Sequence, residues 1–316
     1  MKKTALLFPG QGSQYVGMGR EFVETDPDAA DLMRMASMYL GIDVRELCLE
    51  GPMEELTQVR NLHVALTSVN LICLKQLEKR LGYRKYAYVA GHSLGEFSAL
   101  RAAGVLNTEE TINIVNMRGK LLACEGEKHP GCMAAVLGLD LATVEKILAE
   151  GKPAGTVVIA NHNTETQIVL SGDAGGLAAA ETLCKAAGAK VIPLKVSVAN
   201  HSPLIADAVK PFFGHLAGFD FRDTSVPMFF NVTAALEHDR FIIRNELMPQ
   251  QLVSRVRWYE IIQAMLADGV ELFVELGPGK VLTGLMKKIL PKGSSVQCMQ
   301  ADTPETLDAV AVAIQS

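Results

Sequence analysis

The sequence offers little that points to a metal centre or to disulfide bonds. Its cysteines are few and scattered, with no Cys-x-x-Cys pair and no Cys/His group at ligand spacing. They are Cys48, Cys73, Cys124, Cys132, Cys184 and Cys298. We therefore expect reduced packing cysteines, and neither a bound metal nor a cofactor.

Long apolar runs are also missing. No stretch approaches the roughly 20 apolar residues needed to cross a bilayer. The segment Met1–Thr4 continues directly into a short strand-like run, without the core of a signal peptide. The formal net charge of −5 gives no overall basic surface of the kind on which nucleic-acid binding rests. These absences predict a cytoplasmic protein that binds neither a membrane nor nucleic acid.

What is present is a regular alternation of apolar, strand-like runs with helical patterns. The 316 residues, 49% of them hydrophobic, suffice for a large core and a second, smaller unit. The alternation predicts an α/β protein with a mostly parallel, buried sheet. Expected strands are 5–8, 86–90, 228–231, 272–276 and 295–299. Expected helices cover much of 17–80, with a cap near Thr67, and then 96–103, 108–123, 202–216, 240–267, 280–290 and 304–314.

The segment from 132 to 198 has a distinct order of predicted strands and helices. Its patterns predict strand 132–137, helix 140–150, strand 156–160, strand 167–171, helix 174–187 and strand 190–198. The order β-α-β-β-α-β is typical of a ferredoxin-like unit. We expect residues 130–198 to form this small subdomain, inserted into a large domain made of residues 1–129 and 199–316.

The most informative short motif is Gly91-His92-Ser93-Leu94-Gly95. It follows an apolar strand-like run and opens into a helical pattern, which is the layout of a nucleophile elbow. Glycines without Cβ atoms allow so tight a reversal, with the serine hydroxyl pointing outward beside a helix N-terminus. We interpret Ser93 as a nucleophile that forms an acyl-enzyme. The alternative is an ordinary strand-to-helix turn with an incidental serine.

A serine nucleophile needs a base, and the chain has seven histidines. His92 adjoins the serine, but neighbouring side chains diverge on a tight turn, so we interpret it as structural. His201 follows a predicted strand and precedes a capped helix, a place on a loop where catalytic groups are often mounted. His201 is therefore the predicted base, with an ordinary core or surface histidine as the alternative.

An oxyanion hole needs two backbone N–H groups that point at one position. Leu94, the residue after the nucleophile, supplies one. The loop Pro9-Gly10-Gln11-Gly12-Ser13 follows the first strand and suits the other, which we assign to Gln11. The alternative for this loop is a simple tight turn.

Arg118 bears on the kind of acyl group. If the helix after Ser93 runs outward for about 15 Å and the next helix returns by the same length, Arg118 comes back level with the serine. A guanidinium beside the acyl pocket would bind a carboxylate and select an acyl group with a free acid at its far end. The alternative is a surface arginine on an amphipathic helix.

Five motifs together resemble one family, the malonyl-CoA:acyl carrier protein transacylases, over nearly the whole chain. They are Phe8-Pro9-Gly10-Gln11-Gly12-Ser13-Gln14, Gly91-His92-Ser93-Leu94-Gly95-Glu96, Met117-Arg118-Gly119-Lys120, Val196-Ser197-Val198 leading to His201, and Glu275-Leu276-Gly277-Pro278-Gly279-Lys280-Val281-Leu282. The resemblance implies a hydrolase-like large domain interrupted by a ferredoxin-like one. It also implies that Ser93 takes malonyl from coenzyme A and passes it to the phosphopantetheine thiol of an acyl carrier protein.

The same resemblance implies further roles. His201 would be oriented by a backbone carbonyl on a glutamine-bearing segment, which matches Gln250-Gln251-Leu252, with Gln251 favoured, and Asp207 would then be a surface residue. Asn161 and Asn163 match positions near the mouth of the site. Asn200 stands in the stretch before the histidine that varies with acyl preference, so it is a candidate substrate contact.

Alternatives remain open at this stage. The acyl group could be methylmalonyl or a larger carboxylated extender, in fatty-acid or polyketide synthesis. The chain could instead be a hydrolase of carrier-bound acyl groups, or a non-catalytic module that docks carrier proteins. Nothing in the sequence demands more than a monomer. Because such carrier proteins are acidic, a basic face should receive them; the candidates are Lys75, Lys79, Arg80, Arg84 and Lys85, or Lys287, Lys288 and Lys292.

Overall fold

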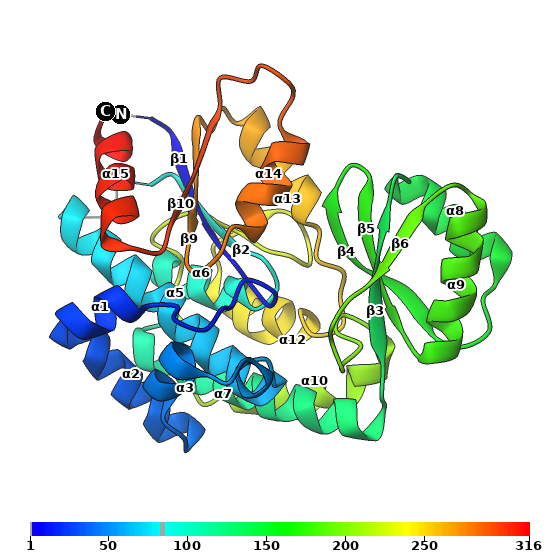
Figure 1. Cartoon of the computed structure of the whole chain (residues 1–316), viewed down its shortest axis with the longest axis horizontal. Helices are drawn as coiled ribbons and strands as arrows, with labels where there is room; N and C mark the ends of the chain where they lie inside the picture. The colour runs from blue at the N-terminus through cyan, green and yellow to red at the C-terminus, as the bar shows by residue number, and fades with distance from the viewer. Residues whose placement is uncertain (1, 83–85) are drawn as a thin grey trace.

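A mainly parallel sheet forms the centre of the computed structural model, which describes residues 2–82 and 86–316 (Figure 1). The strand order is β10-β9-β1-β2-β7-β8, and every pairing is parallel except that of β8 with β7. The strands are β1 (Thr4–Phe8), β2 (Tyr88–Gly91), β7 (Met228–Phe229), β8 (Leu236–Glu237), β9 (Leu272–Leu276) and β10 (Gln297–Ala301). The predicted α/β class with a mostly parallel sheet is confirmed.

Helices cover both faces of this sheet. On β1, Leu6 and Phe8 pack into one core while Ala5 and Leu7 pack into another, as the two-residue period of a strand requires. The first core is shared with helices such as α5 and α7, and the second with α13 and α14. The helical elements are α1 (Arg20–Thr25), α2 (Pro27–Leu40), α3 (Val44–Glu50), α4 (Met53–Leu56), α5 (Val59–Leu81), α6 (Gly95–Ala103), α7 (Thr108–Lys128), η1 (Pro203–Ala208), α10 (Val209–Leu216), α11 (Arg240–Ile242), η2 (Ile243–Leu247), α12 (Met248–Gln250), α13 (Trp258–Ala267), α14 (Val281–Ile289) and α15 (Pro304–Gln315).

A second sheet, antiparallel, stands beside the first (Figure 1, green). Its strand order is β4-β5-β3-β6, and one of its faces packs against α8 and α9. The opposite face carries Met133, Ala135, Ala160 and Val169. The elements are β3 (Cys132–Leu137), α8 (Leu141–Gly151), β4 (Val157–Thr164), β5 (Gln167–Gly172), α9 (Ala174–Ala186) and β6 (Lys190–Pro193). The predicted order β-α-β-β-α-β is therefore observed, although β6 ends five residues earlier than expected.

Several sequence predictions were wrong in detail. Thr67 caps no helix: it is fully buried in the middle of α5, which runs without a break because other helices surround it. The expected helix over 240–267 is interrupted, with a π-helical turn at η2 and an irregular stretch before α13. The short strand β8 was not predicted. In each case tertiary contacts, and not the local pattern, set the boundary.

Within the described residues, no helix is both long enough and apolar enough to span a membrane.

Candidate active site

Ser93 lies on a sharp turn between β2 and α6. Its φ of +50° falls in the left-handed region that side chains rarely adopt, so the surrounding structure must hold it there. The flanking glycines make the turn possible: a Cβ on Gly91 would lie 2.0 Å from the Gly95 carbonyl carbon, and one on Gly95 would lie 2.0 Å from the Phe8 carbonyl oxygen. The geometry is that of the elbow predicted from the sequence.

The hydroxyl of Ser93 meets an imidazole. Ser93 Oγ lies 2.7 Å from His201 Nε2, although the residues are 108 positions apart. On the other side of the ring, His201 Nδ1 lies 3.0 Å from the carbonyl oxygens of both Gln251 and Ser254. Carbonyl oxygens only accept, so Nδ1 carries the proton and Nε2 is free to accept from the serine.

Burial decides the charge state of this imidazole. His201 is 2% exposed, and burial lowers its pKa to about 3, with Arg118 and His92 acting in the same direction. A neutral imidazole at physiological pH can take the proton of an attacking hydroxyl. The predicted position of His201 was partly wrong, because no strand precedes it directly: β6 ends at Pro193, and His201 stands on an irregular segment with a φ of +59°.

The loop after β1 packs against the elbow. A Cβ on Gly10 would lie 2.4 Å from the His92 carbonyl oxygen, so the two backbones touch. Ser13 Oγ donates to the Gly10 carbonyl oxygen at 2.8 Å and closes the loop. Among the described residues, no protein acceptor pairs with the backbone N–H of Gln11 or of Leu94. Two free amides therefore stand on segments that contact each other beside Ser93.

A pocket opens over Ser93 and His201 between the two sheets. The pocket wall includes Gln11 from the first loop, Met133 and Val169 from the small sheet, and Val281 and Leu285 from α14. Asn161, Asn163 and Asn200 also line it, as expected from the resemblance. The structure thus brings together most of the residues singled out in the sequence.

His92 and the asparagines have distinct surroundings. His92 Nε2 lies 2.8 Å from Asn163 Oδ1, and its ring packs edge-on against Trp258. Asn200 Oδ1 is buried and has no hydrogen-bond partner among the described residues. Asp207 is exposed, as predicted, and does not approach His201 Nδ1, whose partners are carbonyl groups.

Arg118 is buried and not on the surface. Its side chain is not part of the pocket wall but lies behind it, with Nε and Nη2 donating to Gln251 Oε1 at 3.3 and 3.2 Å. Nη1 is 3.1 Å from Nε2 of His63, whose pKa burial holds well below its usual range, so that ring accepts. Burial lowers the pKa of Arg118 to about 10, and the guanidinium remains charged at neutral pH.

Gln251 connects Arg118 to the nucleophile. Its Nε2 donates to the carbonyl oxygen of Ser93 at 2.8 Å, while its own backbone carbonyl accepts from His201. One residue therefore contacts the serine, the histidine and the arginine. Three residues distant in sequence converge on it.

Two supporting residues were missed in the sequence. Asn231 Oδ1 accepts from the Ser93 amide at 2.8 Å, and its Nδ2 donates to the Gly91 carbonyl oxygen at 2.7 Å. Its own amide donates to Glu96 Oε1 at 2.6 Å. Burial raises the pKa of Glu96 to about 8. The available signals were the position of Asn231 at the end of a predicted strand, and the acidic residue that ends the elbow motif.

Comparison with known proteins agrees with this geometry. The acyl transferase domain family matches residues 5–308. The chain is 39% identical over 310 residues to the malonyl CoA-acyl carrier protein transacylase of Bacillus subtilis, covering 98% of this chain and 96% of that protein. It is 38% identical over 291 residues to the protein of the same name from Escherichia coli K12, covering 92% and 94%.

Solved structures give the same result. An acyl carrier protein S-malonyltransferase from Vibrio cholerae superposes with a TM-score of 0.91 at 36% identity, over 98% of this chain and 99% of that one. A malonyl-transacylase in complex with a type II polyketide acyl carrier protein superposes with a TM-score of 0.92 at 32% identity, over 98% and 99%. The fold and the serine site therefore define an acyltransferase. Within that class, the chain belongs to the malonyl CoA-acyl carrier protein transacylase family.

Proposed function

We propose that this acyltransferase moves a malonyl group from coenzyme A to the phosphopantetheine thiol of an acyl carrier protein, through an ester on Ser93. The observation that carries the proposal is the contact of Ser93 Oγ with a neutral His201 whose far nitrogen is held by two carbonyl oxygens. The names of the relatives supply the substrate class.

The chemistry follows from this arrangement. Ser93 Oγ attacks the thioester carbonyl carbon while His201 Nε2 takes the hydroxyl proton. The negative charge that develops on the carbonyl oxygen is stabilised by the N–H groups of Gln11 and Leu94, each contributing about 3 kcal/mol. The C–S bond then breaks, and His201 returns the proton to the sulfur of coenzyme A. The carrier thiol regenerates Ser93 by the same steps in reverse.

The proposed acyl selection rests on Arg118. The charged guanidinium of Arg118 donates to the side chain of Gln251, and that side chain donates in turn to the backbone carbonyl of Ser93. In this proposal the positive charge of Arg118, held behind the pocket wall, attracts the malonyl carboxylate, and Asn161, Asn163 and Asn200 contact the substrate along the pocket wall. A buried cation without a carboxylate partner would have little use in an enzyme that transfers only uncharged acyl groups.

We also propose a two-domain organisation of the chain. Residues 1–129 and 199–316 form a hydrolase-like catalytic domain, and residues 130–198 form a ferredoxin-like subdomain. Support comes from the strand order β4-β5-β3-β6 with α8 and α9 on one face. The other face supplies Met133, Asn161, Asn163 and Val169 to the pocket, so the subdomain closes one side of the acyl site.

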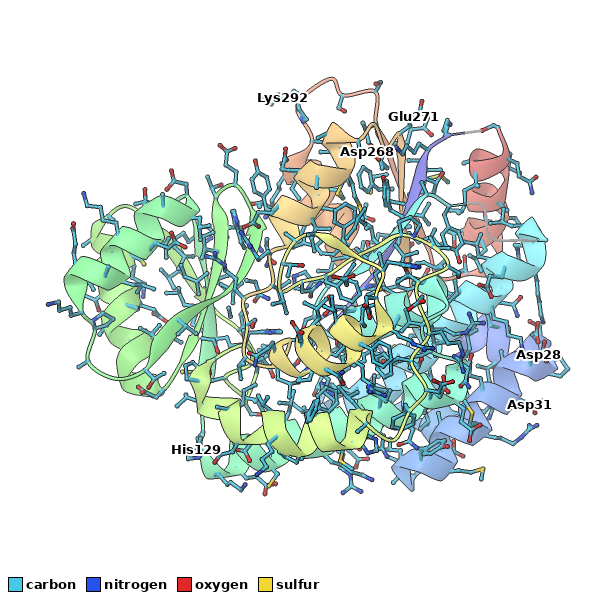
Figure 2. All side chains as sticks on the ribbon, turned by 180° about the vertical axis from the view of Figure 1, so that it is seen from behind. Asp28, Asp31, His129, Asp268, Glu271 and Lys292 are labelled. Atoms are coloured by element: carbon cyan, nitrogen blue, oxygen red, sulfur yellow. The ribbon has the colours of Figure 1, made fainter. Side chains whose placement is uncertain are left out.

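The carrier protein is proposed to dock beside α14. Lys287 and Lys292 are exposed, and neither has an ion-pair partner within residues 2–82 and 86–316. Lys288 donates to Gln167, a residue of the pocket wall, and Figure 2 shows Lys292 at the surface. The group is therefore positively charged, as an acidic partner requires, and Lys288 connects it to the pocket wall.

The other basic candidate is less suitable. Lys75 and Lys79 pair with Asp28, and Arg80 pairs with Asp308, so their charges are already compensated. Arg84 and Lys85 lie outside the described residues. Since every residue of the proposed site comes from one chain, we propose that the monomer is active.

Intact-mass measurement tests the function. Incubation with malonyl-CoA should give a stable malonyl adduct, which Ser93→Ala abolishes and which holo carrier protein discharges onto itself. Rapid appearance of free malonate without carrier protein would instead indicate a hydrolase. Full acyl transfer by Ser93→Ala would show that Ser93 does not carry the acyl group, and the absence of any adduct or transfer with the parent chain would leave only a docking module.

A further inference from the structure

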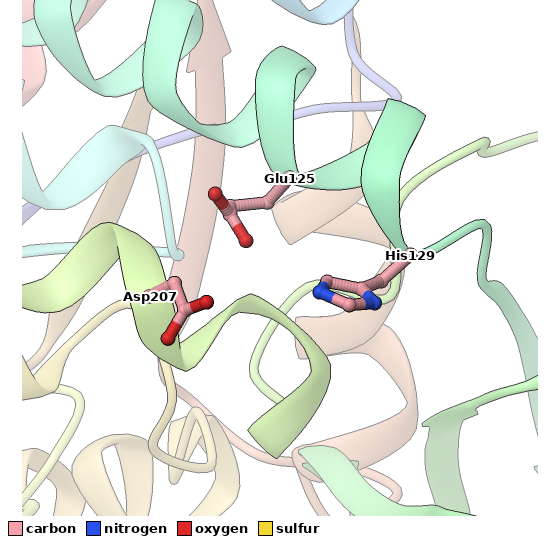
Figure 3. A group of neighbouring side chains, drawn as sticks. All are labelled: Glu125, His129 and Asp207. Atoms are coloured by element: carbon pink, nitrogen blue, oxygen red, sulfur yellow. The ribbon is translucent and has the colours of Figure 1, made fainter.

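Three potential metal ligands lie together away from the acyl pocket. Glu125 and His129 come from the C-terminal end of α7, and Asp207 comes from η1. One ligand atom from each of the three lies within 4.8 Å of those of the other two. Figure 3 shows the Glu125 carboxylate pointing from α7 into the space beside Asp207 and His129.

The surroundings of Glu125 are a second, independent indication of a bound cation. The residue is only 4% exposed, and its Oε1 accepts from Lys128 Nζ at 2.8 Å. Its Oε2 is buried and has no hydrogen-bond partner among the described residues. A buried carboxylate oxygen without a partner is costly, and a bound cation would remove that cost.

The end of α7 adds to the attraction for a cation. This helix has 21 residues, and His129 is its C-cap. The last carbonyl groups of a helix carry partial negative charge, which favours a cation within the final turn. Two carboxylates and a helix C-terminus therefore face the same small space from two different elements.

The donor set determines which cation fits. One imidazole nitrogen and two carboxylate oxygens suit a first-row divalent ion such as Zn²⁺, whose bonds to nitrogen and oxygen are about 2.0–2.2 Å long. Ligand atoms within 4.8 Å of one another need only small rotations of the two exposed side chains to reach one ion. Water can fill the remaining coordination position.

We propose that Glu125, His129 and Asp207 form a divalent-cation site that ties the end of α7 to η1. The same helix carries Arg118, and η1 begins two residues after His201. The ion lies outside the acyl pocket and takes no part in the transfer chemistry. The bound ion would hold α7 and η1 together close to the connection from α7 to β3. Of these two elements, α7 carries Arg118 and η1 follows His201.

Calorimetric titration of the chelator-treated full chain with ZnCl₂, in phosphate-free buffer near neutral pH, tests the site. We expect saturable binding of one ion and a rise in the unfolding temperature. His129→Ala and Asp207→Asn change exposed side chains, and each should weaken binding at least about tenfold and remove the thermal shift. His238→Ala, which removes another exposed histidine, should bind Zn²⁺ like the parent chain.

Three results would overturn the proposal. They are the absence of saturable binding in the parent chain, unchanged affinity in both His129→Ala and Asp207→Asn, and an equal loss of affinity in His238→Ala. Titration with Co²⁺, whose visible absorption reports its ligands, gives a second readout on the same variants.

Discussion

The side-chain oxygen of Asn231 accepts a hydrogen bond from the amide of Ser93 over 2.8 Å, across 138 positions of sequence. The side-chain nitrogen of Asn231 donates to the carbonyl oxygen of Gly91. Because Asn231 binds the chain on both sides of the turn, it holds the backbone of Ser93 in its left-handed conformation. The elbow motif supplies a turn that can adopt this shape. Asn231 supplies the long-range contacts that keep it there.

Asn231→Ala is expected to slow acyl loading by up to about 100-fold while leaving the protein folded. Its loss leaves the Ser93 amide and the Gly91 carbonyl without partners, at about 1–3 kcal/mol for each group, and lets the hydroxyl drift from His201. Stopped-flow or quenched loading from malonyl-CoA measures the rate, and thermal unfolding measures the stability. Asn245→Ala, at an exposed asparagine, is the matched control. An unchanged loading rate would show that Ser93 needs no such support.

Arg118→Ala should reverse the acyl preference. Losing the cation removes a buried charge pair with the malonyl carboxylate, worth about 2–5 kcal/mol, or roughly 30-fold to several thousand-fold in malonyl loading. Acetyl loading should be spared or improved. The measured quantity is the ratio of malonyl to acetyl loading within each variant, which is independent of how much protein is folded. Arg222→Ala, which removes a partly exposed arginine paired with Glu110, is the control. An unchanged ratio in Arg118→Ala would remove Arg118 from substrate selection.

Stability should fall between pH 4.5 and 8 because of Glu96. Burial raises its folded pKa to about 8 from a reference value of 4.5, so the folded state holds a proton across this range while the unfolded state releases it. The stabilisation is therefore complete below about pH 4.5 and is lost as the pH rises through 8. Glu96→Gln has no proton to lose and should show a flatter profile, with a gain over the parent chain that grows towards pH 8. Denaturant unfolding at several pH values tests this, and parallel profiles for both proteins would contradict it.

Gly95→Ala should destabilise the fold by about 1–3 kcal/mol or more, because the new Cβ would lie 2.0 Å from the Phe8 carbonyl oxygen and neither backbone can move freely. Gly214→Ala offers a matched comparison in α10, where a Cβ meets no atom within 4 Å. That substitution should stabilise the helix by up to about 1 kcal/mol. Chemical denaturation measures both. Equal effects would mean that the elbow does not require glycine for close approach.

Local sequence patterns predicted the structural features that depend on residues close together along the chain. The alternation of strands and helices, the glycines around Ser93 and the order β-α-β-β-α-β were all predicted because periodicity and turn geometry are set within a few residues. Gln11 and His201 were assigned from the loop and the capped helix in which they stand, and the family resemblance then indicated Gln251. Arg118 was expected level with Ser93 from helix lengths alone, and the structure connects it to that residue through Gln251.

Tertiary structure decided the rest. No local pattern shows that Glu96 is buried against Asn231, that Arg118 lies behind the pocket wall against His63, or that η2 interrupts the expected helix. These outcomes depend on which segments meet in space and how much water they exclude, and those same contacts set the pKa values of Glu96 and His201. The sequence by itself determined which residues could do acyl chemistry, whereas their distances, charges and supports arose only when the chain packed.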